Sequence, residues 1–574
     1  MFLFLAHSCV SPLETQPSTE IQSTATGNNE AIARASDTSQ DDLIRLPDTT
    51  LSTVEHSLLH KLEELEGLSP TGDYDTLDAV LGVDLEHNSA AASELTIENA
   101  IVFAIENNLD IRLSTLQPQI AAQSVVAAQA AFDFVLGAGA SKNRLRIHQQ
   151  QAVAPGNRPI SSAERASEIF SSNASLTKKL NSGGTFVLST DVTKTETESQ
   201  DFDYSPDPAW QTIGTIDLTQ PLLRNFGEKV TLSQIQLSQI DKDKTNEELR
   251  KTLNEIITAT EQSYLDLYLQ WRKLQINQWL LEQGEGVVTT LELRMAYDTG
   301  MADYAQAVAT VQRRRADVIS QQSEVHAASD QVKKLINTTQ YPLDSEIIIQ
   351  PTSTILANPV SISLRQALVT AIENRPDLRA LALDIQSGEI NIEVAKNAQL
   401  PQLDMQAQMS FYGLGDTTGR GYEEVFDGDY VNYLAGLSLS VPLGNRAAKA
   451  NTKITRLQQM SAVASYKKGI QQATIDIKKA LRDIVTNASL MRANKDYRIA
   501  QTENLRALLV EEETMAGLTP TFLNLKLQTQ AGLATARTAE FSSVINYNKS
   551  IAELYKAMGI TTQKHQVDVE VILN

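Results

Sequence analysis

The sequence predicts a mixed α and β protein in which one long-helix unit occurs twice, with strands inserted into each copy. Three observations support this fold class. A stretch near residue 95 recurs near residue 362, two stretches of roughly seventy residues have helical periodicity, and shorter segments alternate between apolar and polar residues. Apolar residues make up 42% of the 574 positions and aromatic residues only 5%, so the core must consist mainly of Ala, Leu, Ile and Val.

The negative charge is concentrated near the start of the chain. The net charge is -21, and residues 1–90 hold sixteen Asp or Glu against three Lys or Arg. A chain this acidic lacks the basic surface that nucleic-acid binding requires, so nucleic acid is excluded as a partner. The longest apolar runs fall far short of the ~20 residues of a membrane-spanning helix. A role at a membrane therefore requires a β-barrel or an anchor.

The single cysteine, Cys9, excludes an internal disulfide. It ends a short apolar run that resembles the end of a lipoprotein signal but lacks a basic start. Two interpretations remain open: Cys9 is lipidated and translation starts upstream, or it is an ordinary cysteine. The rest of residues 1–90 is rich in Ser, Thr, Gln and Asp, which predicts a flexible acidic tether with a brief helix near 54–66. His56 and His60 stand four apart within it, but no further metal ligand lies nearby.

An internal duplication organises the remaining chain. Residues 95–112 and 362–379 are identical at eight of eighteen positions. Two further landmarks recur in the same order: Pro221 corresponds to Pro442, and Gly300 to Gly517. We therefore divide the chain into the tether, a first repeat, a second repeat and a C-terminal tail, at residues 1–90, 91–345, 346–560 and 561–574.

Strict alternation in the second repeat predicts two amphipathic strands. From Leu403 to Phe411 and from Tyr433 to Val441, every second residue is apolar and most of the others are polar. A transmembrane β-barrel needs such strands, although a sheet packed on a soluble core would alternate in the same way. A cluster of aromatic residues at the strand ends favours the membrane: Tyr412, Tyr422, Phe426, Tyr430 and Tyr433. The glycine-rich segment 413–421 predicts an external loop with no helix after it.

The first repeat shows the same strands with about 46 additional residues. One predicted strand carries an apolar face that includes Phe132, Phe134 and Leu136, and the segment 210–220 forms the returning strand. An additional hairpin is expected near 174–180 and 185–193. Two outcomes remain open for this hairpin: it adds two strands to the barrel, or it decorates an outer loop.

Long helices follow Pro221 and Pro442 in the two repeats. Apolar residues fall at alternating three- and four-residue steps, as in coiled coils. Such stripes include Leu249, Leu253 and Trp271 in the first repeat, and Ile477 and Leu481 in the second. Seventy helical residues span about 105 Å. A compact domain has no need of this length, whereas a structure that bridges a periplasm does.

Residues 94–560 resemble the TolC-like outer-membrane efflux proteins. The resemblance is carried by the segments 104–110, 220–227 and 297–301, and by the duplicated order of elements. It implies a duplicated long-helix coiled-coil α-barrel with a transmembrane β-barrel shared by a homotrimer. Elementary physics agrees, because a few strands cannot close a water-filled barrel and lipid does not tolerate open sheet edges.

The resemblance also implies the function. We expect an outer-membrane export channel that conducts cargo passively for a tripartite efflux or type I secretion system, with helices projecting into the periplasm. Its partners would be a periplasmic adaptor protein, an inner-membrane pump and outer-membrane lipid; no catalytic residue, metal or cofactor is expected. The alternative is a periplasmic adaptor or helical scaffold, but adaptors have one helical hairpin between β-domains and this chain has two. The sequence names neither the cargo nor the pump.

Site residues are expected at the two helical turns, which the resemblance places at the periplasmic tips. The adaptor-contact candidates are Arg294, Gly300, Met301, Gly517 and Leu518, and the two glycines also suit a tight turn between helices. The family's constriction uses acidic residues beyond these turns, but here those positions hold Gln306, Leu523 and Lys526. The acidic residues nearest the tips are instead candidates for the channel entrance: Asp298, Asp303, Glu511, Glu512 and Glu513. For the run of three glutamates, a solvated helix face is the alternative.

Overall fold

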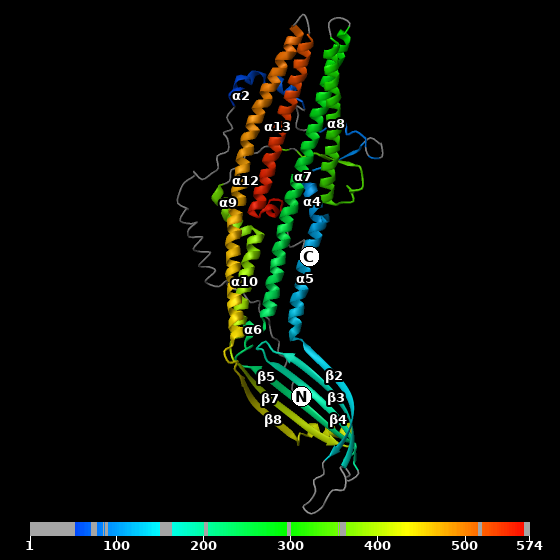
Figure 1. The fold of residues 1–574 in the computed structure, drawn as a ribbon, viewed down its shortest axis with the longest axis vertical. Helices are drawn as coiled ribbons and strands as arrows, with labels where there is room; N and C mark the ends of the chain where they lie inside the picture. The colour runs from blue at the N-terminus through cyan, green and yellow to red at the C-terminus, as the bar shows by residue number, and fades with distance from the viewer. Residues whose placement is uncertain are drawn as a thin grey trace, which may run out of the picture.

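In the computed structural model the molecule is long and narrow, with a helical shaft at one end and a β-sheet at the other (Figure 1). The structure describes residues 52–70, 77, 79–83, 85, 90–149, 163–199, 205–295, 300–353, 355, 363–514 and 519–567. Cys9 lies outside these residues. Within them, no helix is both long enough and apolar enough to cross a membrane.

Two antiparallel helical hairpins form the shaft. The first pairs α7 (Ser233–Arg294) with α8 (Met301–Ile336), and the second pairs α12 (Arg446–Thr514) with α13 (Pro520–Met558). The 62 residues of α7 and the 69 of α12 agree with the expected lengths and span about 93 and 104 Å. The predicted stripes are core: Leu249, Leu253 and Ile477 are fully buried. The helices are therefore held by packing along one face rather than by local propensity alone.

The duplication is visible in the two shorter helix pairs. The first pair is α4 (Ile97–Asn107) and α5 (Leu109–Gln129); the second is α9 (Leu364–Asn374) and α10 (Pro376–Asn397). Thr96 and Ser363 cap the equivalent helices α4 and α9 with the same side-chain hydrogen bond to the third backbone N–H. Near them, β1 (Ala92–Leu95) pairs in parallel with β6 (Ile348–Pro351), a short sheet that the alternation did not predict.

Six antiparallel strands form the large sheet, in the order β2-β3-β4-β5-β7-β8. Phe132 precedes the sheet in the 3₁₀-helix η3 (Ala130–Phe132), so its predicted place on the first strand is wrong. The predicted hairpin is present and longer than expected. The strand bounds are β2 (Phe134–Gln149), β3 (Ala163–Lys179), β4 (Thr185–Ser199), β5 (Ala209–Pro221), β7 (Gln402–Gly415) and β8 (Val431–Ser440).

A short helix, α11 (Thr418–Asp427), connects β7 to β8, which corrects the prediction that no helix follows the glycine-rich segment. The Thr417 hydroxyl caps its first turn by accepting from the N–H of Arg420, and Gly428 ends it in the left-handed conformation. The Glu424 carboxylate accepts a hydrogen bond of 2.9 Å from the N–H of Leu414 in β7. These contacts fold the connection back onto the sheet instead of leaving it an open loop.

Residues 52–70, which we call the strap, pack on the second hairpin. The strap contains α2 (Thr53–Ser57), η2 (Leu59–Lys61) and α3 (Leu62–Leu68), in agreement with the brief helix expected near 54–66. Figure 1 shows α2 beside α12, far from the sheet. Ion pairs fix it there: Lys495 with Glu55 at 2.7 Å, and Arg498 with Glu66 at 2.6 Å. This part of the predicted tether is therefore bound to the shaft.

Two short helices complete the fold, α6 (Glu228–Thr231) before α7 and α14 (Thr561–Lys564) after α13. The second of these contacts the middle of the shaft, where the Lys564 ammonium donates to Glu261 at 2.8 Å. Burial opposes ionisation of Glu261, but His565 and Lys564 outweigh it and hold the pKa of this carboxyl below its usual range.

Candidate functional site: the two sheet faces and the helical tips

The large sheet has one apolar and one polar face. Directly opposed residues share a face, so the register assigns every strand residue to one side. One row of the apolar face runs across all six strands through Leu136, Leu176, Leu188, Ile216, Met409 and Tyr433. The predicted face of β7 and β8 is confirmed, because Leu403 pairs with Leu439 and Met405 with Leu437. Tyr412, one of the aromatic residues noted at the strand ends, lies on the polar face.

Charged residues bound the apolar face at both ends of the strands. On β3, Glu168 and Lys178 share this face and stand ten residues apart, with Phe170 and Leu176 between them. Ten residues of a strand tilted by about 40° rise about 25 Å, which is the height of a bilayer's apolar core. At the inner boundary the Lys178 ammonium lies 4.4 Å from the ring centroid of Phe134. This geometry suits a lysine that covers an aromatic ring while its charge reaches water.

Three of the small or hydroxyl-bearing residues on the apolar face, Thr190, Thr212 and Gly214, lie against α11. The Tyr422 hydroxyl of α11 is 3.0 Å from that of Thr190, and Thr212 is fully buried against the backbone of Gly421. A Cβ at Gly214 would meet Val425 of α11 at 3.5 Å. These three residues therefore leave room for the helix, whereas Ser172 and Lys142 are polar residues of the same face on β3 and β2.

Hydrogen-bonding side chains cover the opposite, polar face. Gln406 donates to Asp217 at 2.9 Å, and the hydroxyls of Thr215 and Ser410 are 3.4 Å apart. Gln408 donates to the same Ser410 at 3.2 Å. Such a face needs water beside it, because its amide, hydroxyl and carboxylate groups have more hydrogen-bonding capacity than their neighbours satisfy. The two faces of the sheet therefore suit different environments, one apolar and one aqueous.

At the far end of the shaft, the tips of both hairpins pack into one apolar cluster, which we call the tip cluster. It draws residues from all four long helices: Val287, Leu291, Ala307, Leu508, Phe522, Leu523 and Leu527. Leu523, at a position where the family's constriction uses an acidic residue, is 1% exposed and belongs to this core. The two hairpins are thus joined at their tips and not only along the shaft.

Arg314 joins the hairpins directly behind the tip cluster. From α8 it donates to the main-chain oxygen of Leu280 in α7 at 2.6 Å and to that of Leu527 in α13 at 2.8 Å. Burial and the neighbouring charge of Arg313 lower its pKa to about 10. Gly284 leaves room for the guanidinium, because a Cβ there would lie 2.7 Å from its Nη1 atom.

Arg314 is not among the site residues predicted from the sequence, although its position on α8 carries a signal. Ala307, Val311, Arg314 and Val318 follow the three- and four-residue steps of the buried stripe on α8. A cation at such a position must find partners inside the protein, because an unpaired buried charge is too costly.

A second group of buried cations lies in the middle of the shaft. Arg272 of α7 donates twice to the Tyr268 hydroxyl, at 3.0 and 2.9 Å. Glu540 of α13 pairs with Arg537 at 2.7 Å and with Arg498 of α12 at 2.8 Å. Within the described residues, no group of His, Cys, Asp or Glu side chains could hold a metal ion. The ion pairs of Arg498 with Glu540 and with Glu66 bind α12 to α13 and to the strap.

Three of the candidate adaptor contacts, Arg294, Gly300 and Met301, are among the described residues, and they lie at the tip of the first hairpin. Arg294 is the last residue of α7 and is half-buried, and Met301 begins α8 with 68% of its surface exposed. Gly300 is the residue immediately before α8, with its backbone extended. Gly517 and Leu518 lie outside the described residues, as does Asp298.

The candidate entrance acids differ in their surroundings. Asp303 lies in the first turn of α8, where a negative charge suits the helix N-terminus. Glu512 pairs with Lys526 of α13 at 2.6 Å, whereas Glu511 and Glu513 are exposed near the end of α12. The exposed position of these two glutamates fits both an entrance and a solvated face.

The family model for the outer membrane efflux protein matches residues 367–560, which contain β7, β8 and the second helical hairpin. This match confirms, over the second repeat, the resemblance to outer-membrane efflux proteins that the sequence predicted.

Three curated relatives of this chain are named for export or efflux. The chain is 25% identical over 308 residues to the pyoverdine export outer membrane protein OpmQ of Pseudomonas putida. The aligned region covers 52% of this chain and 61% of the relative. The chain is 22% identical over 302 residues to the toluene efflux pump outer membrane protein TtgI of the same species. The aligned region covers 51% of this chain and 60% of the relative. The match thus spans about three fifths of each curated relative. Both are named as export or efflux proteins, not as enzymes.

Solved structures share the fold of this chain. The CmeC outer membrane channel of Campylobacter jejuni aligns with a TM-score of 0.60 at 14% identity, over 87% of this chain and 95% of that one. CusC aligns with a TM-score of 0.56 at 16% identity, over 90% and 99%. The resemblance to TolC-like channels inferred from the sequence is confirmed at the level of fold.

Proposed function

We propose that this chain is the outer-membrane channel of a tripartite export system and that it conducts cargo passively as a homotrimer. The sheet would stand in the outer membrane, and the shaft would project into the periplasm. The observation that carries the proposal is the six-stranded sheet with an apolar face of bilayer height, mounted on helices of about 100 Å. A sheet and shaft of these dimensions suit a conduit across a membrane and a periplasm.

The open sheet supports assembly from several copies. Eight strands close a barrel whose interior is filled by side chains, so six strands cannot enclose water. Lipid does not tolerate free sheet edges, because their N–H and C=O groups have no partners there. Several copies must therefore share one barrel, with the polar face lining the lumen.

The tips are the proposed site of contact with a periplasmic adaptor and, through it, with an inner-membrane pump. Met301 and Arg294 present an apolar and a charged side chain at the end of the first hairpin. The entrance acids Asp303, Glu511 and Glu513 would favour cations at this end of the channel. Relatives are named for pyoverdine, solvent and toluene export; the chemistry of the polar face, mainly hydroxyl and amide groups, suits passage of such varied cargo without a binding site.

Reconstitution in planar bilayers tests the function. The purified full-length chain should insert as an oligomer and conduct ions in discrete steps, with cation preference. Protein that forms no conducting oligomer in bilayers and remains monomeric in detergent would contradict the proposed function.

A further inference from the structure

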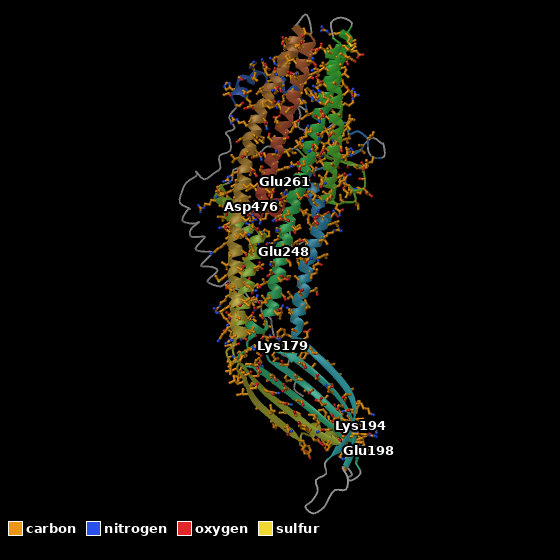
Figure 2. The ribbon with its side chains drawn as sticks, in the orientation of Figure 1. Lys179, Lys194, Glu198, Glu248, Glu261 and Asp476 are labelled. Atoms are coloured by element: carbon orange, nitrogen blue, oxygen red, sulfur yellow. The ribbon has the colours of Figure 1, made fainter. Side chains whose placement is uncertain are left out.

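The hairpin of β3 and β4 is part of the wall of the sheet, not of an outer loop. β3 pairs with β2 from Phe134↔Lys178 to Gln149↔Ala163, and β4 pairs with β5 from Thr185↔Thr219 to Thr195↔Ala209. Figure 2 shows that the hairpin spans the full height of the sheet: Lys179 lies beside the helices, and Lys194 and Glu198 lie at the opposite end. Both strands carry the apolar and polar faces of their neighbours. A barrel that contains β2 and β5 must therefore contain β3 and β4.

The second repeat shows what the sheet would be without this hairpin. There, β7 leads through α11 directly to β8, so that repeat contributes two strands while the first contributes four. The first repeat has about 46 additional residues, and these are thus an insertion into the wall of the sheet. Three copies of a symmetric chain with two strands per repeat would supply twelve strands; three copies of this sheet supply eighteen.

The two free edges of the sheet are suited to each other. β2 runs away from the shaft and β8 runs back towards it, so β2 of one copy and β8 of the next would meet antiparallel. Both edges are apolar on the same face near the shaft: Leu136 of β2 is 78% exposed and Leu437 of β8 is 70% exposed. Side chains this large and this exposed fit lipid and a neighbouring strand better than water.

Charge distinguishes the outer ends of the two edges. Beyond the apolar face, β2 carries Arg144 and Arg146, both exposed. The connection that enters β8 carries Asp427 and Asp429, also exposed. Arg144 contacts Glu168 of its own copy at 3.4 Å with 55% of its side chain still exposed. A basic edge therefore faces an acidic one wherever β2 of one copy adjoins β8 of the next.

We propose that three copies close an eighteen-stranded barrel, in which the β3–β4 hairpin widens the pore and β2 pairs with β8 of a second copy of this chain. The proposal rests on the proposed function and adds the width of the channel and the identity of its seam. Barrel diameter grows roughly linearly with strand number, so the hairpin widens the barrel about 1.5-fold relative to twelve strands. Barrels of 16–18 strands hold open aqueous channels.

Electron microscopy of the detergent-extracted full chain tests the strand count. A threefold particle with eighteen continuous strands is expected. A threefold particle whose barrel has twelve strands, with β3 and β4 folded outside it, would overturn this inference and leave the export function intact. Particles without a threefold channel would overturn both.

Charge exchange tests the seam. R144E/R146E and D427K/D429K should each lower the trimer fraction in detergent several-fold, and their combination should restore it. The matched control is K194E, which reverses a charge on the same face two strands in from the edge and should leave the trimer intact. The assignment of this edge pair would be overturned if the combined variant assembled no better than R144E/R146E or D427K/D429K alone. It would also be overturned if both of these variants remained fully trimeric.

Deletion of residues 163–199 tests the width. The connection that remains joins β2 to β5, as α11 joins β7 to β8 in the second repeat. Pore area follows the square of the diameter, so single-channel conductance should fall to about half or less. A deletion variant that inserts and conducts like the full chain would overturn the inference, and the strand count from electron microscopy decides the width independently if the variant does not fold.

Discussion

The guanidinium of Arg314 lies 2.8 Å from the main-chain oxygen of Leu527, so a single side chain of the first hairpin is bonded to the backbone of the second. The same side chain is bonded to Leu280 on its own hairpin. Separation of the hairpins behind the tips would therefore break a buried, charge-assisted hydrogen bond. Such bonds contribute more to stability than bonds between neutral groups.

Replacing Arg314 by Met should loosen the tips. The side-chain volume is largely kept, but the oxygens of Leu280 and Leu527 lose their donor, at a cost of about 1–3 kcal/mol each if they stay dry. Hydrogen exchange in residues 280–295 and 519–530 should accelerate. Arg313→Met is the matched control, because Arg313 is exposed and should change neither exchange nor melting temperature. Equal effects of the two substitutions would refute the role assigned to Arg314.

Two glycines of α7 should respond in opposite directions to alanine. In Gly284→Ala the new Cβ would lie 2.7 Å from Nη1 of Arg314 and 3.2 Å from Val311, so the substitution should destabilise the hairpins. In Gly286→Ala it meets nothing within 4 Å, and the helix should gain up to about 1 kcal/mol. Thermal unfolding of both variants checks the prediction, which fails if the two melting temperatures shift in the same direction.

Tyr264→Phe should destabilise the junction between the shaft and the short sheet. The buried hydroxyl donates to the oxygen of Leu95 at 2.8 Å and accepts from the N–H groups of Thr352 and Ser353 at 3.1 Å. Its loss leaves buried backbone groups without partners, at about 1–3 kcal/mol. Tyr497→Phe, at a tyrosine 42% exposed, is the control and should be nearly neutral in the same denaturant titration.

The strap should loosen in acid. The hydrogen bond from Arg506, with further help from Lys61, lowers the pKa of Glu503 from 4.5 to about 2. A group whose pKa is depressed in the folded state stabilises it above the unfolded value and ceases to do so as pH falls through the folded value. Protection of residues 52–70 against hydrogen exchange should therefore decline between pH 4.5 and about 2. In Glu503→Gln this part of the decline should disappear, and an unchanged profile would show that other groups control the strap.

Replacing Glu511, Glu512 and Glu513 together by Gln should reduce the cation preference of the reconstituted channel. The reason is electrostatic, since a ring of carboxylates at an entrance raises the local cation concentration. Because Glu512 already neutralises Lys526, a larger share of the effect should come from the other two. Reversal potentials in a salt gradient measure the change; Glu389→Gln in α10 is the control. Unchanged selectivity would place these glutamates on a solvated outer face.

Hydrophobic periodicity predicted the strands and helices in which a single apolar pattern runs along the whole element. The alternation from Leu403 to Phe411 survives in the register with β8, because every second residue there meets the same environment. The stripe through Leu249 and Leu253 is buried for the same reason. The sequence left the place of the β3–β4 hairpin open, because alternation is the same in a wall strand and in a hairpin beside the wall. Only the pairing with β2 and β5 decides between them.

Elements that depend on distant partners escaped prediction. Local signals around α11 are weak, and its position comes from contacts such as that of Tyr422 with Thr190, 232 residues away in sequence. The packing of the strap could not be predicted either. Its acidic residues suggest a solvated segment, and only the fold shows that Arg498 and Lys495 lie beside them. The tip residues Asp298, Gly517 and Leu518 keep only their sequence-based assignment.

The strap also constrains the order in which the chain can mature. The partner of Glu66 lies 432 residues later, and Pro70 accepts a hydrogen bond from Arg537, 467 residues later. A chain synthesised from its N-terminus therefore presents this segment before the helices that receive it. Its docking must be among the last steps of folding, so a docked strap marks a protomer whose second hairpin is already complete.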